Sequence, residues 1–150
     1  MSRILLIQID RSGLPAKNIG PLPEVAQQSC AQTSELYQRV GFHVPWIGYL
    51  ALQDSNVVGT CAFTAPPRDD KVEIAYFTFP EFEGRGIATV MARELIAIAR
   101  AAAPAIIVTA HTLPQRNASN SILEKLGFEF FSSIDHPEDG KVWEWHLALN

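Results

Sequence analysis

The sequence has few cysteines, little excess charge and no long apolar run, and each scarcity excludes a class of protein. Cys30 and Cys61 are the only cysteines, and no CxxC or Cys–His spacing surrounds them, so we expect neither a disulfide framework nor a metal site. The net charge of -4 disfavours polyanions such as nucleic acid and mildly attracts cationic amines. The apolar start, residues 3–9, is too short to span a membrane and lacks the features of a secretory signal. These scarcities favour a cytoplasmic protein that binds neither membrane nor nucleic acid.

What remains is the composition of one globular domain. Of the 150 residues, 47% are apolar and 19% are charged, which suits a single core and is too apolar for a disordered chain. No internal repeat or low-complexity tract divides the chain, although residues 15–23 form a proline-rich loop. We therefore expect one domain spanning residues 1–150.

Periodicity predicts the order β-α-β-β-β-α-β-α-β-β. The predicted helices cover residues 24–40, 87–103 and 117–126, and the second is expected to pack inward through Ile87, Val90, Met91, Leu95, Ile98 and Ala102. The predicted strands cover residues 4–9, 46–53, 57–65, 71–79, 105–112, 128–134 and 141–149. This order is typical of an α/β (α+β type) fold with a mixed, mostly antiparallel central sheet and helices on both faces. The strand at 105–112 is apolar throughout, so it is expected in the interior of the sheet.

Gly84-Arg85-Gly86 stands directly before the second helix, where a helix exposes unpaired N–H groups and the positive end of its dipole. Two glycines let the oxygens of an anion approach the main chain closely. A Walker loop would need Gly-Lys-Ser/Thr at this place, and a dinucleotide fingerprint would need a third glycine where Thr89 stands. The loop therefore predicts an anion site of another kind, with a simple helix-starting turn as the alternative.

Two motifs in the same order resemble those of the GNAT superfamily of N-acetyltransferases. Residues 83–88, Glu-Gly-Arg-Gly-Ile-Ala, resemble its motif A, Gln/Arg-x-x-Gly-x-Gly/Ala, with Glu83 at the first position. Residues 114–131 resemble its motif B, Asn-x-x-Ser-x-x-x-Leu-x-x-Leu-Gly-Phe, with Ser119, Leu123 and Gly127 in register. The asparagine of the motif falls on Arg116, and Asn117 follows it by one place. The subgroup most similar to this chain is the one that acetylates the N-termini of ribosomal proteins.

The resemblance implies the GNAT (acyl-CoA N-acyltransferase) fold and acetyl-CoA as cofactor. In that family the glycine loop grips the pyrophosphate, and the end of the preceding strand bonds the pantetheine arm like an added strand. The cofactor-binding residues implied in this way are Phe77, Thr78, Phe79, Gly84, Arg85, Gly86, Ile87, Ala88, Thr89 and Asn117.

The resemblance also implies the catalytic groups of an N-acetyltransferase that joins acetyl-CoA and amine in a ternary complex. Glu73 is the candidate base, because similar enzymes carry a glutamate at this place in the strand; His111 is a second candidate. The tyrosine that many members use as the acid is replaced by Leu123, which makes Ser119 the candidate acid. A role of Ser119 as the cap of the third helix is the alternative.

The acceptor would be a primary amine, on a protein N-terminus or a small molecule. Its site is expected between the first helix and the closing hairpin, with Tyr37, Trp46, Trp143 and Trp145 as walls, although aromatic residues at such spacings also suit a core. A non-catalytic acyl-CoA sensor of the same fold is the main alternative. A nucleotide-binding protein is a third hypothesis, although the glycine loop lacks the lysine that such a protein would need. The sequence names neither the amine nor the oligomeric state, so a homodimer stays open.

Overall fold

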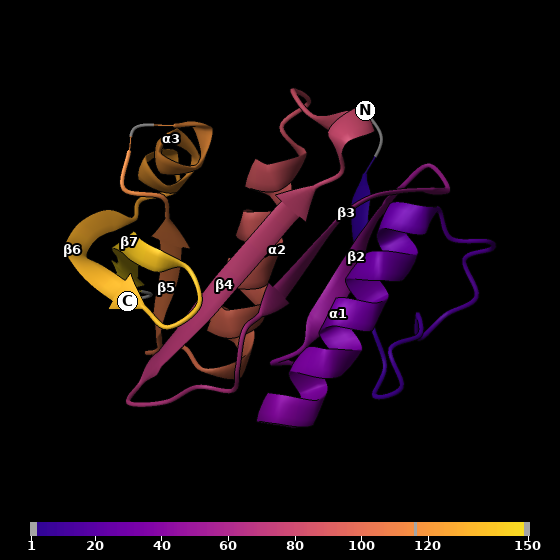
Figure 1. Ribbon diagram of the computed structural model, residues 1–150, viewed down its shortest axis with the longest axis horizontal. Helices are drawn as coiled ribbons and strands as arrows, with labels where there is room; N and C mark the ends of the chain where they lie inside the picture. Colours follow the sequence, from indigo (N-terminus) through magenta and orange to yellow (C-terminus); the bar gives the residue numbers. More distant parts are fainter. Residues whose placement is uncertain (1–2, 116, 149–150) are drawn as a thin grey trace.

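The computed structural model describes residues 3–115 and 117–148, which form a mixed sheet with helices on both faces (Figure 1). The predicted order of elements is confirmed, with one added 3-10 turn, η1. The bounds are β1 (Ile4–Gln8), α1 (Glu24–Val40), β2 (Gly48–Gln53), β3 (Asn56–Phe63), β4 (Lys71–Thr78), η1 (Pro80–Phe82), α2 (Ile87–Ala102), β5 (Ile107–Thr112), α3 (Ala118–Lys125), β6 (Glu129–His136) and β7 (Gly140–Ala148).

The sheet has seven strands in the order β1-β2-β3-β4-β5-β7-β6. Its pairs are antiparallel except for β4 and β5, which run parallel and are joined through α2. The predicted mixed, mostly antiparallel sheet is therefore confirmed, as is the interior position of β5. No helix in the described ranges is long and apolar enough to cross a bilayer.

The two faces of the sheet carry different helices. Figure 1 shows α1 in front of the sheet and α2 behind it. The side chains of β4 alternate between the two faces. Ala75 and Phe77 face α1 across a cavity, whereas Val72 and Ile74 are buried on the α2 side. One strand thus links two separate surfaces.

The inward stripe of α2 differs in part from the prediction. Ile87, Met91 and Leu95 are buried as expected, but the last turns bury Ile96 and Ala99, while Ile98 is half-buried and Ala102 exposed. A helix has 3.6 residues per turn, so residues spaced by three and four do not stay on one line along its axis. Over four turns the side of α2 that contacts the sheet therefore shifts. The hairpin β6–β7 forms as predicted; Leu149, its expected last residue, lies outside the described part.

Candidate active site

Strands β4 and β5 separate partway along their length. They pair only between residues 71–74 and 107–110 in the described chain, whereas β4 continues to pair with β3 as far as Thr78. The main chain of β4 beyond Ile74 therefore faces an opening on the β5 side, which Figure 1 shows as two arrows diverging toward their tips. Main-chain groups at such an opening can bond an extended ligand as an added strand would.

The glycine loop lies beyond the tip of β4. Gly84 and Gly86 have φ of +79° and +77°, and a Cβ added at either would meet nothing within 4 Å. Helix α2 begins at Ile87 without a side-chain cap. Within the described residues, the amides from Gly84 to Thr89 donate no hydrogen bond to the surrounding structure. These free amides and the positive end of the α2 dipole make a site for an anion.

A cavity of about 440 Å3 joins this loop to β4 and α3. Its lining includes Thr78, whose buried hydroxyl oxygen Oγ1 has no hydrogen-bond partner among the described residues. A buried hydroxyl without a partner costs free energy, so it favours a bound polar group. The unpaired hydroxyl, the free amides and the open space over the glycines fit a diphosphate with a polar, extended arm.

Most of the predicted cofactor residues meet in this cavity, and three do not. The lining includes Phe77, Thr78, Gly84, Gly86, Ile87, Ala88 and Thr89, together with Glu83. Arg85 instead places its guanidinium 5.5 Å from the ring centre of Phe82. Phe79 differs from the prediction of free main-chain groups, because its N–H donates to Val58 and its C=O accepts from Phe82. Asn117 caps α3 by accepting from the N–H of Asn120 at 3.2 Å; Arg116 lies outside the described residues.

Ser119 lies in the same cavity, opposite Tyr76 of β4. The alternative of Ser119 as the cap of α3 is wrong, since Asn117 holds that place. Burial raises the pKa of Tyr76, and the neighbouring Ser119 hydroxyl offsets part of the rise, so Tyr76 keeps its proton at neutral pH. Leu123, at the place of the family's tyrosine, is fully buried. Tyr76 of β4 thus brings a protonated phenol to this cavity.

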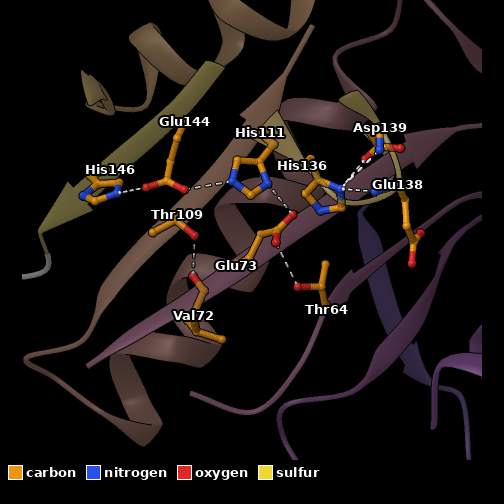
Figure 2. Close-up of polar contacts among 10 residues, drawn as sticks. All are labelled: Thr64, Val72, Glu73, Thr109, His111, His136, Glu138, Asp139, Glu144 and His146. Carbon is orange, nitrogen blue, oxygen red and sulfur yellow. Dashed lines mark hydrogen bonds and ion pairs between the residues drawn. The ribbon is translucent and has the colours of Figure 1, made fainter. Parts of the chain in front are cut away.

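Glu73 lies on the α1 side of β4, in a chain of hydrogen bonds that crosses three strands (Figure 2). Its Oε1 accepts from the Thr64 hydroxyl at 3.2 Å, and its Oε2 accepts from His111 Nδ1 at 3.0 Å. His111 Nε2 donates to Glu144 at 2.9 Å, and Glu144 accepts from His146 at 2.7 Å. The carboxylate of Glu73 is thereby fixed in position at both oxygens.

The charges in this chain favour Glu73 over His111 as the base. The hydrogen bond to Glu73, with that to Glu144 and the charges of both carboxylates, raises the pKa of His111 to about 9, although burial opposes the rise. Burial alone would raise the pKa of Glu144, but the bonds from His111 and His146 hold it below its usual value. His111 therefore carries a proton at neutral pH and cannot accept another.

His136 of β6 completes the cluster. Its ring centre lies 5.6 Å from that of His111, and its Nδ1 accepts the N–H groups of Glu138 and Asp139. One potential metal-ligating atom from each of Glu73, His111 and His136 lies within 4.8 Å of the others. Sequence spacing gives no sign of this group, because its members come from three different strands.

A second cavity, of about 270 Å3, lies between α1 and the same face of β3 and β4. Ala75 and Phe77 form its floor, and Arg39 of α1 lies at its wall and pairs with Glu138 at 3.7 Å. The ion pair joins α1 to the hairpin that carries His136, so the cavity and the Glu73 cluster share one surface. This surface lies in the predicted acceptor position, between α1 and the closing hairpin.

The aromatic walls predicted for the acceptor site are mostly structural. Tyr37 is buried, donating its hydroxyl hydrogen to Ile9 and accepting the N–H of Gly48. Trp145 is buried too, and donates to the Thr112 hydroxyl on the other face of the sheet. Trp46 packs edge-on against Phe63 with ring centres 5.0 Å apart. The prediction of these residues as walls is therefore corrected: Ser29, Gln32, Thr33 and Leu36 of α1 line the cavity instead.

Comparison with known proteins gives one family and a set of related folds. The family model described as an acetyltransferase (GNAT) domain matches residues 15–129. No curated protein sequence matches the chain.

Solved structures with the same fold share little sequence with this chain. A RimL ribosomal L7/L12 alpha-N-protein acetyltransferase in complex with coenzyme A has 17% identity and a TM-score of 0.65, over 84% of this chain and 72% of that one. An acetyltransferase from Salmonella typhimurium that modifies the N-terminal serine of ribosomal protein L7/L12 has 15% identity and a TM-score of 0.69, over 98% and 95%. The yncA protein of Salmonella typhimurium, with acetyl-CoA bound, has 17% identity and a TM-score of 0.67, over 99% and 95%.

Proposed function

Because the chain belongs to the GNAT acetyltransferase family, we propose that it transfers the acetyl group of acetyl-CoA to a primary amine, by direct attack within a ternary complex. Its subgroup is the one typified by N-terminal acetyltransferases of ribosomal proteins, several of which share its fold. The observation that carries the proposal is the separation of β4 from β5 beside the uncapped glycine loop.

Main-chain groups around the cavity beside the glycine loop would bind acetyl-CoA. The amides of residues 84–89 would hold the diphosphate, and the exposed edge of β4 beyond Ile74 would bond the pantetheine amides. Acetyl-CoA, when bound, supplies the thioester carbonyl. Tyr76 and Phe77 of β4 line both this cavity and the cavity on the α1 face, so the thioester would meet the amine between the two faces.

Glu73 is proposed as the base that takes a proton from the amine, directly or through water. Its two oxygens are held by Thr64 and His111, so its position is set before the substrate arrives. On the other face, the Ser119 and Tyr76 hydroxyls are placed to return a proton to the leaving thiolate. The two proton transfers would thus occur on opposite sides of one strand.

The free energy needed to deprotonate the amine favours an α-amino group over a lysine side chain. An α-amino group with a pKa near ~8 is about one tenth neutral at pH 7, whereas a lysine near ~10.4 is neutral in only about one molecule in 2,500. The difference corresponds to roughly 3 kcal/mol that a lysine-specific site would have to supply. We therefore propose a protein N-terminus or a small α-amine as the acceptor. Both cysteines are buried free thiols, which suits a reducing cytoplasm.

The test is a panel of amines incubated with acetyl-CoA: peptide N-termini, amino acids, diamines and aminoglycosides. Coenzyme A binding is measured first by calorimetry, and acetylated products are then identified by mass spectrometry. We expect binding together with transfer to at least one α-amine. Tight binding without transfer to any amine would favour the acyl-CoA sensor, and adenine nucleotides competing as well as coenzyme A would favour a nucleotide-binding protein.

A further inference from the structure

Three metal-ligating side chains from three strands converge on the acceptor face. Glu73, His111 and His136 belong to β4, β5 and β6, and one ligand atom from each lies within 4.8 Å of the others. Figure 2 shows the rings of His111 and His136 on either side of the Glu73 carboxylate. Acetyl transfer as proposed above uses Glu73 and His111 but gives no role to His136.

We propose that this cluster binds one divalent transition-metal ion such as Zn²⁺, through the Glu73 carboxylate, His111 Nδ1 and His136 Nε2. Imidazole nitrogens and a carboxylate oxygen are ligands that zinc prefers. Three protein ligands leave the fourth position of a tetrahedral ion open to water or to an amine.

The outer contact of His111 matches that of bound metal sites, where the second ring nitrogen faces a carboxylate. His111 turns Nε2 to Glu144 Oε1 at 2.9 Å, and Glu144 is itself held by His146. His136 turns Nδ1 toward Asp139 Oδ2 at 3.5 Å. A metal at Nε2 of His136 requires the ring proton on Nδ1. The N–H groups of Glu138 and Asp139 would then give up their hydrogen bonds to this nitrogen, and the Asp139 carboxylate would accept the new N–H.

Two of the three ligand atoms already lie near the separation that zinc requires. Zinc–nitrogen bonds of about 2.0 to 2.1 Å place tetrahedral ligands about 3.3 Å apart. Glu73 Oε2 and His111 Nδ1 are already 3.0 Å apart, and the Thr64 hydroxyl holds the other Glu73 oxygen. His136 must approach them, and it lies at the end of β6, next to the exposed turn at 137–139.

A metal ion at this site would inhibit acetyl transfer, because the Glu73 carboxylate would bind the metal and could not accept a proton from the amine. This consequence rests on the function proposed above, whereas metal binding itself does not. The site would then act as an inhibitory switch that responds to free zinc.

The test uses the full chain, stripped of metal with a chelator and then dialysed. Zn²⁺ is titrated by calorimetry, and Co²⁺ is titrated by visible absorption, which distinguishes tetrahedral coordination. We expect one ion per chain and the intense absorption bands of tetrahedral Co²⁺. His136→Gln should weaken binding at least 100-fold, and Asp139→Asn, which changes an exposed outer contact, at least tenfold. His43→Gln alters an exposed histidine outside the cluster and should leave affinity unchanged.

Equal affinity in the wild type and His136→Gln would overturn the site, as would Co²⁺ spectra without tetrahedral bands. Circular dichroism of each variant confirms that it is folded. Inhibition is measured separately, with acetylated product counted by mass spectrometry because the released thiol itself binds Zn²⁺. We expect one equivalent of Zn²⁺ to abolish transfer in the wild type but not in His136→Gln. If the chain transfers no acetyl group, calorimetry and cobalt spectra still decide the metal site, so the two proposals fail separately.

Discussion

Glu73 and Tyr76 stand three residues apart on β4 and serve opposite faces of the sheet. Glu73 receives a hydrogen bond from His111 on the acceptor side, while Tyr76 meets Ser119 in the cofactor cavity. The backbone between them runs along the opening beside β5. A single strand therefore carries the proposed base and one of the proposed acids on its two faces, beside the gap that an acetyl group would cross.

Glu73→Gln keeps the shape of the side chain and removes the carboxylate. Since general-base catalysis contributes about 10² to 10⁴-fold, we expect kcat to fall at least 100-fold while the affinity for acetyl-CoA changes less than threefold. Steady-state kinetics and calorimetry measure the two quantities. Glu129→Gln, an exposed change on β6, is the control and should leave both unchanged. Equal turnover in Glu73→Gln and wild type at every pH would exclude Glu73 as the base.

Gly86→Glu should weaken coenzyme A binding at least tenfold, about 1.4 kcal/mol, because it adds bulk and a negative charge to the diphosphate site. Gly20→Glu is a matched control: Gly20 also has positive φ, +88°, and open space around a Cβ, but lies in the proline-rich loop. Both variants place a side chain at a positive φ, so they carry similar backbone strain. A difference between their coenzyme A affinities, measured by calorimetry, therefore reports on the glycine loop itself. An unchanged dissociation constant in Gly86→Glu would reject the diphosphate site.

Glu83→Gln tests the carboxylate that lines the cofactor cavity. Removing a negative charge beside a diphosphate should tighten coenzyme A binding by about threefold at low salt. Because Glu83 is exposed, the gain should shrink in 0.5 M salt, which screens exposed charges that lie more than about 4 Å apart. Glu81→Gln, on the neighbouring turn, should change nothing. Weaker binding in Glu83→Gln would mean that the carboxylate itself contacts the cofactor.

Tyr37→Phe tests the structural role that replaces the predicted acceptor wall. The change leaves the buried C=O of Ile9 and N–H of Gly48 without partners, so we expect a loss of about 2 to 4 kcal/mol in unfolding free energy. Tyr49→Phe removes one hydrogen bond, to Pro45, and should cost about 1 kcal/mol. Urea denaturation measures both. A Tyr37→Phe protein of full stability but altered amine preference would restore the acceptor role.

The raised pKa of His111 predicts a pH-dependent stability. A folded pKa of about 9 against 6.5 for the free side chain means that protonated His111 stabilises the fold. Its contribution, about 3 kcal/mol, is complete below pH 6.5 and is lost as the pH rises through 9. Urea unfolding of the metal-free protein at pH 6 and pH 10 should therefore show a larger decrease for the wild type than for Glu144→Gln. NMR titration of His111 gives the pKa directly; a value near 6.5 would contradict this prediction.

Local patterns predict the order of elements and the glycine loop before α2 because those features depend on short stretches of sequence. Helix α1 begins and ends where its periodicity and Gly41 predict, and the two glycines mark the loop without further information. The cluster around His111 could not be found in this way, since Glu73, Glu144 and His136 reach it only through strand register.

The sequence alone does not decide the roles of Tyr37 and Trp145. Their spacing suits either a wall or a core, and hydrogen bonds to Gly48 and Thr112, distant in sequence, decide for the core. Asn117 likewise resembles a cofactor contact in the motif, yet its side chain caps α3. Motif residues therefore predict which segments line one cavity better than they predict what each side chain bonds.

A crystal structure of the acetyl-CoA complex tests the account most directly. We expect the diphosphate on the amides of residues 84–89, the pantetheine arm along β4 beyond Ile74, and the thioester carbonyl between β4 and β5, facing Glu73. Acetyl-CoA bound away from the glycine loop, or a gap between the strands closed by side chains, would contradict it.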